Sequence, residues 1–264
     1  MASFSARTAA RNGSSTLVLP RSVNPVLIAL LHLRSPVIDH LAWLAIDVAD
    51  LEEARPFYER ILNLEPIEEV VSGERHFRAG DSNLHLRGPD AESQGGAHVH
   101  YAFETGAAAL DEWEDRLSEA GPVDSHDFGV YRSLYVFDPD DHCVELGGRA
   151  DGTKDITGIF EIVLEVEMLE AAEAFYHELG CSVIDRGEDR KRVRLDAGPF
   201  ELELWEPQTG LAGAEPGSHV ELGLGVRDPA QAVDRAATSG ATLDGSRESA
   251  VIDPDGHRLV FVSH

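Results

Sequence analysis

The stretch IDHLAWLAIDVADLEEARPFY, residues 38–58, has the pattern of a β-strand followed by an amphipathic helix. The pattern recurs 118 residues later, without a gap, as ITGIFEIVLEVEMLEAAEAFY, residues 156–176. Further pieces recur in the same order: AGDSNLHL from Ala79 matches AGPFELEL from Ala197, and DPDDHCVEL from Asp138 matches DPDGHRLVF from Asp253. A repeat of this length indicates an internal duplication.

The duplication predicts two domains, residues 37–150 and 155–264, joined by the Gly- and Asp-rich segment GGRADGTKD. Each domain divides again, because a strand, a helix and three short strands occur twice in it. The pattern is therefore βαβββ, four times over. Strands outnumber helices and the late strands of each module are separated only by turn signals, which is typical of an α+β fold and not of alternating α/β units.

Residues 1–36 differ from the rest of the chain in containing four arginines and no acidic residue. An Arg- and Ser-rich, acid-poor start resembles a transit peptide. We favour a disordered tail, or translated upstream sequence with the true start near Val37. The apolar stretch VNPVLIALLHL within this segment is too short to span a bilayer.

The chain of 264 residues carries a formal net charge of −26. Such a charge disfavours binding to nucleic acid or to an anionic membrane, and it is typical of the solvated acidic surface of halophilic cytoplasmic proteins. Two cysteines without a CxxC spacing do not indicate a disulfide framework, which fits a reducing cytoplasm.

Four polar residues lie at positions where strands are expected to face inward. His40 and His100 begin the first strands of the first two modules, and His85 and Glu145 lie in the last strands of the same modules. Both pairs are 60 residues apart, so each pair occupies equivalent positions. If the two modules pack with pseudo-twofold symmetry, the four side chains converge on one cavity. Imidazoles with a carboxylate suit a divalent ion such as Fe, Mn, Zn, Ni or Co.

The second half has lost this set. Its corresponding positions are Gly158, Glu203, Glu221 and Val260. Because Gly and Val cannot ligate, we expect residues 155–264 to lack a complete metal site and to serve as a structural domain, a lid or a wall.

In a competing geometry, the modules pair across the two halves of the chain. Glu203 then joins His100 and Glu145, while Glu221 joins the two histidines of the first module. The sequence favours pairing within each half but leaves this alternative open.

The segments DHLAWLAIDVADLEEARPFYERIL, HVHYAFET and YVFDPDDHCVEL resemble the vicinal oxygen chelate superfamily. This superfamily contains glyoxalase I, extradiol catechol dioxygenases, methylmalonyl-CoA epimerase, and the fosfomycin and bleomycin resistance proteins. The resemblance covers residues 38–147 closely and residues 156–262 as a degenerate copy. It implies that the four modules form two tandem glyoxalase-like domains.

The spacing of three residues favours the extradiol dioxygenases among these families. In extradiol dioxygenases a His is followed by a Tyr nine positions later and by the Glu ligand ten further on, and His126, Tyr135 and Glu145 have this spacing. Asp124 and Asp141 depart from the signature, which prefers a small or β-branched residue and a Gly or Pro there.

The family also keeps an acid–base His fifteen residues before the second His ligand, the interval between His85 and His100. The resemblance therefore implies an Fe(II) enzyme, with Mn(II), Zn(II) or Ni(II) as alternative ions, that opens a catechol-type ring with O2. The implied metal ligands are His40, His100 and Glu145, with His85 as acid–base catalyst and Tyr135 and His126 contacting the substrate oxygens.

A rival interpretation uses the same atoms differently. In glyoxalase I and the epimerase, the position of His85 holds a fourth metal ligand, and the chemistry is proton transfer on a dicarbonyl-type substrate without oxygen. A resistance-type transferase belongs to the same alternative. A non-catalytic drug-binding protein is a third class, but it leaves the ligand set unexplained. A homodimer is compatible with each, because this superfamily builds its cups within one chain or across a dimer.

Overall fold

The computed structural model describes residues 37–68, 72–88, 99–188, 191–206 and 220–263. The chain divides into residues 1–35 and a compact unit from Pro36 to His264, to which all that follows belongs. The tail expected over residues 1–36 lies outside the described residues. In the described ranges, no helix is both long and apolar enough to cross a membrane.

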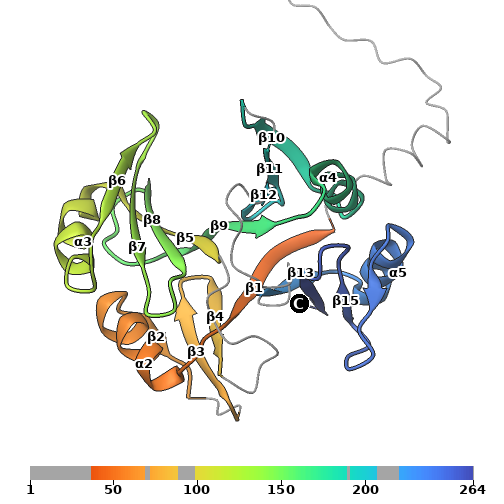
Figure 1. Cartoon of the computed structure of the whole chain (residues 1–264), viewed down its shortest axis with the longest axis horizontal. Helices are drawn as coiled ribbons and strands as arrows, with labels where there is room; N and C mark the ends of the chain where they lie inside the picture. Colours follow the sequence, from red (N-terminus) through yellow and green to blue (C-terminus); the bar gives the residue numbers. More distant parts are fainter. Residues whose placement is uncertain (1–36, 69–71, 89–98, 189–190, 207–219, 264) are drawn as a thin grey trace, which may run out of the picture. The chain divides into compact units, whose positions relative to one another are not determined.

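The four βαβββ modules of an α+β fold are confirmed (Figure 1). The first module comprises β1 (Ile38–Asp47), α2 (Leu51–Pro56) with η1 (Phe57–Ile61), β2 (Glu65–Pro66), β3 (Glu74–Ala79) and β4 (Ser82–Arg87). The second comprises β5 (His100–Gly106), η2 (Ala107–Ala109), α3 (Leu110–Leu117), β6 (Asp124–Asp127), β7 (Arg132–Phe137) and β8 (Cys143–Ala150). The third comprises β9 (Gly158–Glu165), α4 (Leu169–Glu178), β10 (Ser182–Arg186), β11 (Arg192–Asp196) and β12 (Glu201–Trp205). The fourth comprises β13 (Val220–Val226), α5 (Pro229–Thr238), β14 (Thr242–Leu243), β15 (Ala250–Ile252) and β16 (Arg258–Ser263).

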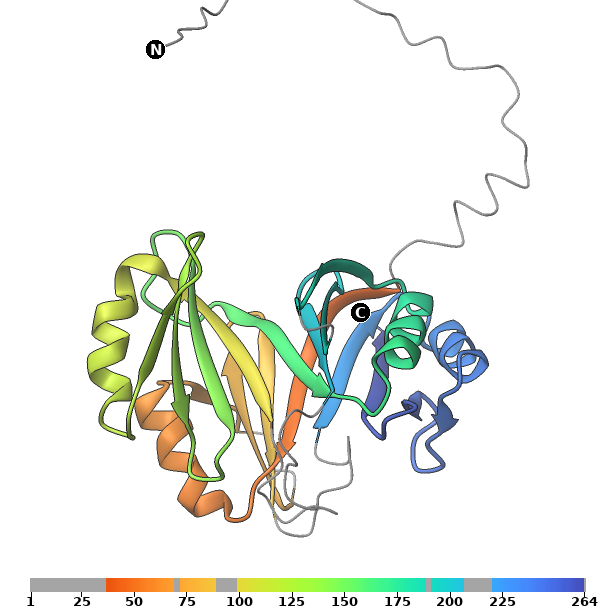
Figure 2. The same ribbon diagram turned by 45° about the horizontal axis from the view of Figure 1, so that its top comes forward.

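The modules combine into two eight-stranded sheets. Sheet A has the order β14-β15-β16-β13-β1-β4-β3-β2, and sheet B has the order β10-β11-β12-β9-β5-β8-β7-β6. The first module therefore pairs with the fourth through antiparallel β1 and β13, and the second pairs with the third through antiparallel β5 and β9. Figure 2 shows β1 beside β13 and β5 beside β9.

The expectation that modules pair within each half of the chain is wrong, and the competing geometry is the observed one. Residues 151–157 are the only link between β8 and β9, and β5 lies directly between these two strands. A connection this short brings the third module against the second at little cost in loop entropy. The remaining first strands, β1 and β13, then pair with each other.

The helices cover the sheet faces that carry the apolar residues. Leu44 and Ile46 of β1 and Phe103 of β5 are fully buried in one continuous core. The helices associate in pairs, since the Arg116 guanidinium near the end of α3 donates to the Arg60 carbonyl in η1 and Arg235 of α5 donates to a carbonyl of α4. Glu145 of β8 lies between the core residues Val144 and Leu146, so its side chain points to the opposite face of sheet B.

Pro56 lies within the first helical stretch, where a proline is expected to kink a helix. The structure shows a change of the helix at this residue. The chain continues after Pro56 as one π-helical turn, in which the Leu62 amide donates to the Phe57 carbonyl at 2.9 Å. A proline interrupts the regular i→i−4 ladder, because it has no amide hydrogen and its ring displaces the preceding turn.

In LYVFDPDDHCVEL, residues 134–146, two runs of alternating apolar residues flank an Asp-Pro-Asp-Asp turn, which predicts a β-hairpin. The hairpin is present as β7 and β8. Its turn is closed by Asp138, whose Oδ1 accepts hydrogen bonds from the amides of Asp140 and His142 at 3.0 and 2.8 Å. Asp141 has a left-handed φ of 64°, which explains why glycine is favoured there; Gly256 has the equivalent place in the second half, with φ 98°. Glu145 of β8 is buried, as the alternation predicts.

Candidate metal site

Two carboxylates lie in one row across the middle of sheet B. Glu145 of β8 is in register with Ala102 of β5, and Ala102 is in register with Glu161 of β9. Side chains in register across neighbouring strands lie on the same face of a sheet. His100 lies two residues before Ala102 and points to that face as well.

The three side chains form a compact buried group. The candidate ligand atoms of His100, Glu145 and Glu161 all lie within 4.8 Å of one another, and all three residues are buried. The His100 Nε2 atom is 3.2 Å from Glu145 Oε2. Ser133 of β7 orients the same carboxylate, because its hydroxyl donates to Glu145 Oε1 at 2.5 Å.

Glu161 has the most unusual environment of the three. Burial, together with the nearby Glu203 carboxylate and only partly offset by Arg194, raises the pKa of Glu161 to about 8. Glu161 Oε2 lies 3.3 Å from Arg194 Nε, yet neither atom makes a hydrogen bond within the described residues. A buried carboxylate oxygen without a hydrogen bond is costly. The group therefore fits a divalent ion, which would supply the missing partner to a set of one imidazole and two carboxylates.

Two arginines border this group on the side of the third module. Glu203 of β12 pairs with Arg192, and it also lies 3.6 Å from the Arg194 guanidinium. Glu203 is thus held by cations and is not a member of the three-residue group.

Aromatic residues form the walls around the group. The Tyr135 ring lies 5.9 Å from the His100 ring and the Trp205 ring lies 6.4 Å from it, both edge-on. Burial, followed by the charge of Glu145 and a hydrogen bond to it, raises the pKa of the Tyr135 hydroxyl, so that this group stays protonated and able to donate. Phe160 and Tyr131 add a further edge-on ring pair.

The structure separates the other two expected metal-site residues from this group. His40 lies on β1 in sheet A, where its ring covers Gly225, and its ligand atoms do not lie within 4.8 Å of those of both His100 and Glu145. His85 lies on β4 of sheet A, stacked against Trp43 at 5.5 Å. Burial, with smaller effects from nearby cationic groups, lowers the pKa of His85 to about 3, so its imidazole is neutral.

Pairing of modules across the two halves was expected to bring Glu221 to these two histidines. Its carboxylate instead interacts with a tryptophan and three arginines. Trp43 Nε1 donates to Glu221 Oε1 at 3.0 Å. Three guanidiniums lie 3.5 to 3.7 Å from its carboxylate, those of Arg87, Arg247 and Arg258. This environment is an ion-pair cluster and leaves no open carboxylate.

The remaining expected catalytic residue, His126, lies on β6 at the edge of sheet B. It is exposed, and its register partner is Ser133, the residue that contacts Glu145. The His126 ring packs 4.9 Å from Phe128. His126 therefore borders the site through Ser133.

Sequence reasoning missed Glu161. The signal was present, because Glu161 is the one charged residue in the run GIFEIVL of β9. An acid within a strand that is otherwise apolar on both faces is a candidate functional residue. The alignment of repeats concealed it, since the equivalent residue of the first module is the apolar Trp43.

Comparison with known proteins agrees with this fold. Residues 37–146 match the sequence profile of the Glyoxalase/Bleomycin resistance protein/Dioxygenase superfamily. No curated protein sequence is significantly similar to the chain. A protein from Bacillus subtilis proposed to be a dioxygenase has a TM-score of 0.68 at 15% identity, over 87% of this chain and 86% of that one. Glyoxalase I from Zea mays has a TM-score of 0.62 at 17% identity, over 85% of this chain and 92% of that one. Identities this low show a shared fold.

Proposed function

Residues 37–146 belong to the glyoxalase/bleomycin resistance protein/dioxygenase superfamily, and from this premise we propose that the protein is a metal-dependent enzyme that acts on a small molecule. The proposed ligands are His100, Glu145 and Glu161, with Mn(II), Zn(II), Ni(II) or Fe(II) as the ion. A divalent ion bound there would act as a Lewis acid toward a substrate that presents two neighbouring oxygens.

The reaction that these residues support best is proton transfer between two carbons of such a substrate, as in the lyase and isomerase members. This proposal rests on Glu161 Oε2, which is buried and makes no hydrogen bond among the described residues. Burial raises the pKa of Glu161 to about 8 in the metal-free protein, so its carboxylate accepts a proton readily whenever it is not held by an ion. Glu161 takes the proton from the carbon beside a carbonyl and delivers it to the neighbouring carbon, so that no oxidant is needed.

Neighbouring side chains prepare the site for this step. Ser133 fixes the Glu145 carboxylate, and the protonated Tyr135 hydroxyl, which is hydrogen-bonded to Glu145, would turn its hydrogen to a substrate oxygen when an ion takes up that carboxylate. The rings of Phe160 and Trp205 limit the access of water on their sides. Arg194 beside Glu161 favours the ionised carboxylate after the proton has been passed on.

Extradiol cleavage of a catechol is the second candidate. It is favoured by Tyr135 beside Glu145 and by the flat aromatic walls, which suit a planar substrate. It is disfavoured by the place of His85, because the expected acid–base imidazole lies on the other sheet. A ligand set with one His and two carboxylates also departs from the two-His, one-carboxylate set of non-haem Fe(II) oxygenases.

Two parallel assays separate the candidates. The metal-loaded protein should convert the hemithioacetal of methylglyoxal and a thiol to the thioester, followed by ultraviolet absorbance, and should consume no O2 with a panel of catechols. Glu161→Gln should abolish the isomerase activity together with metal binding, because Glu161 is proposed both as a metal ligand and as the proton carrier. Oxygen uptake with a catechol, and no thioester, would instead establish the dioxygenase.

A further inference from the structure

A second group of metal-binding side chains lies on sheet A. His76 of β3 and His85 of β4 are register partners in an antiparallel pair, so their side chains stand directly opposite each other on one face. Glu74 precedes His76 by two residues and shares that face. The candidate ligand atoms of the three residues all lie within 4.8 Å of one another.

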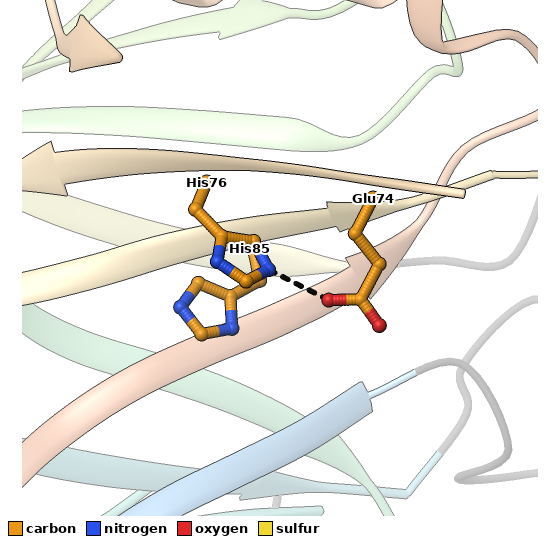
Figure 3. A group of neighbouring side chains, drawn as sticks. All are labelled: Glu74, His76 and His85. Carbon is orange, nitrogen blue, oxygen red and sulfur yellow. Dashed lines mark hydrogen bonds and ion pairs between the residues drawn. The ribbon is translucent and has the colours of Figure 1, made fainter. Parts of the chain in front are cut away.

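The contacts within this group are close. Figure 3 shows the two imidazole rings stacked, with the Glu74 carboxylate beside His76. The ring centroids are 3.7 Å apart with an interplanar angle of 13°, and His76 Nε2 lies 2.6 Å from Glu74 Oε2. All three residues are half-buried, which limits competition by water.

From these contacts we infer that Glu74, His76 and His85 form a second binding site for a divalent transition-metal ion, separate from the group on sheet B. Two imidazoles and one carboxylate are a donor set that Zn²⁺, Ni²⁺ and Cu²⁺ prefer. The register of β3 and β4 fixes the separation of the two backbone positions that carry the imidazoles.

One ring must turn for both nitrogens to reach one ion, because stacked imidazoles direct their in-plane lone pairs side by side. His85 is held between His76 and Trp43, whose ring is 5.5 Å from it at an interplanar angle of 9°. His76 has only one ring neighbour in the described residues and lies at the outer side of the stack. Rotation of His76 about its Cβ–Cγ bond is a soft motion, and it exchanges the hydrogen bond to Glu74 for a shared ion.

A metal ion at this site would hold strands β3 and β4 together. β3 is attached to sheet A through β4 on one side, and its other neighbour, β2, is only two residues long. An ion shared by His76 and His85 ties β3 to β4 by side chains in addition to the backbone ladder. Bound Zn²⁺ therefore raises the resistance of the β3–β4 hairpin to local opening.

The test is Zn²⁺ binding to the full chain, measured by mass spectrometry of metals after dialysis and by calorimetric titration. A background in which Glu145→Gln and Glu161→Gln disable the sheet B group isolates the second site. This background should bind one Zn²⁺, and adding His76→Gln or Glu74→Gln should weaken that binding by tenfold or more. The matched control is His177→Gln, an exposed histidine of α4, which should leave binding unchanged.

Circular dichroism of each variant checks that the fold is retained. A second readout uses Co²⁺ in the same background, because an ion at His85 lies next to Trp43 and should quench its fluorescence, and His76→Gln should abolish this quenching. No Zn²⁺ in the background protein, or equal Zn²⁺ affinity with and without His76, overturns the inference. Failure of the sheet B group to bind metal would contradict the proposed function and would leave the second site unaffected.

Discussion

Glu161 combines two properties that are rarely found together in a structural residue: it is 3% exposed, and one of its oxygens has no hydrogen bond among the described residues. Arg194 lies close to it but is shared with Glu203. A buried carboxyl that must either hold a proton or bind a cation is destabilising when it is charged and empty. The same property makes it useful as a ligand and as a proton carrier.

This environment predicts a pH-dependent stability of the metal-free protein. Folded Glu161 keeps its proton up to a pH of about 8, the value of its pKa, whereas the unfolded chain releases it near the ordinary value of 4.5. The folded state binds more protons in this window, so the contribution of Glu161 to the free energy of unfolding is full below pH 4.5 and is lost as the pH rises to 8. Denaturant unfolding in EDTA should show a steeper loss of stability with pH for the wild type than for Glu161→Gln. Identical pH slopes would contradict the raised pKa.

At the scale of the elements, both halves use one device to attach a helix to the turn of a hairpin. Tyr58, in the turn after α2, donates to Asp138 at 2.5 Å, and Tyr176 of α4 donates to Asp253 at 2.7 Å. Each aspartate also accepts backbone amides in its own turn and faces a histidine four residues later. In the first half, these hydrogen bonds attach the turn before β8 to the helices. They therefore also help to fix the position of Glu145, which lies on β8.

Removal of these hydroxyls should destabilise the protein without a change in fold. Tyr58→Phe and Tyr176→Phe each delete a buried hydrogen bond to a carboxylate, which costs about 1.5–3 kcal/mol. Chemical denaturation measures this loss. Only Tyr58→Phe should also weaken metal binding at sheet B, because only its turn leads into the strand that carries Glu145. Equal effects of both variants on metal affinity would argue against this link.

The helices and strands could be predicted from the sequence, because they depend on the pattern of residues close together in the chain. Alternation with a period of two defined the β7–β8 hairpin and showed that Glu145 points inward, and the position of Pro56 indicated the distortion that follows it. The equal spacing of His40 from His100 and of His85 from Glu145 was misleading. A duplication places residues at equivalent positions in each copy, and equivalent positions lie in one cavity only if those two copies share a sheet.

At the scale of the whole compact unit, the partner of each module is the feature that the sequence left undecided. All four modules begin with a strand of similar apolar character, so β1 has several chemically equivalent partners. The short link of residues 151–157 places β9 beside β5, and β1 then pairs with β13. Both depend on the order of the modules along the whole chain. The assignment of residues 37–150 and 155–264 as separate domains remains a prediction, although each sheet contains one module from either side of that boundary.

This pairing predicts the behaviour of a fragment. Residues 37–150 alone would expose the edges of both β1 and β5, which pair with β13 and β9 in the full chain. Unpaired apolar edges associate with other chains. The fragment should form dimers or larger aggregates in size-exclusion chromatography with light scattering, whereas the full chain provides its own partners. A folded, monomeric fragment would contradict this account.

The most direct test of the central claim is the metal content of the purified protein after loading with Mn²⁺ or Zn²⁺, with the His76→Gln change present throughout to remove the second group. We expect about one ion per chain, as one complete ligand set implies. His100→Ala, Glu145→Gln or Glu161→Gln should each abolish this binding, and His40→Ala and Glu203→Gln should retain it. Retention of stoichiometric metal by Glu161→Gln together with its loss from His40→Ala would contradict the sheet B site and restore the ligand set of His40, His100 and Glu145.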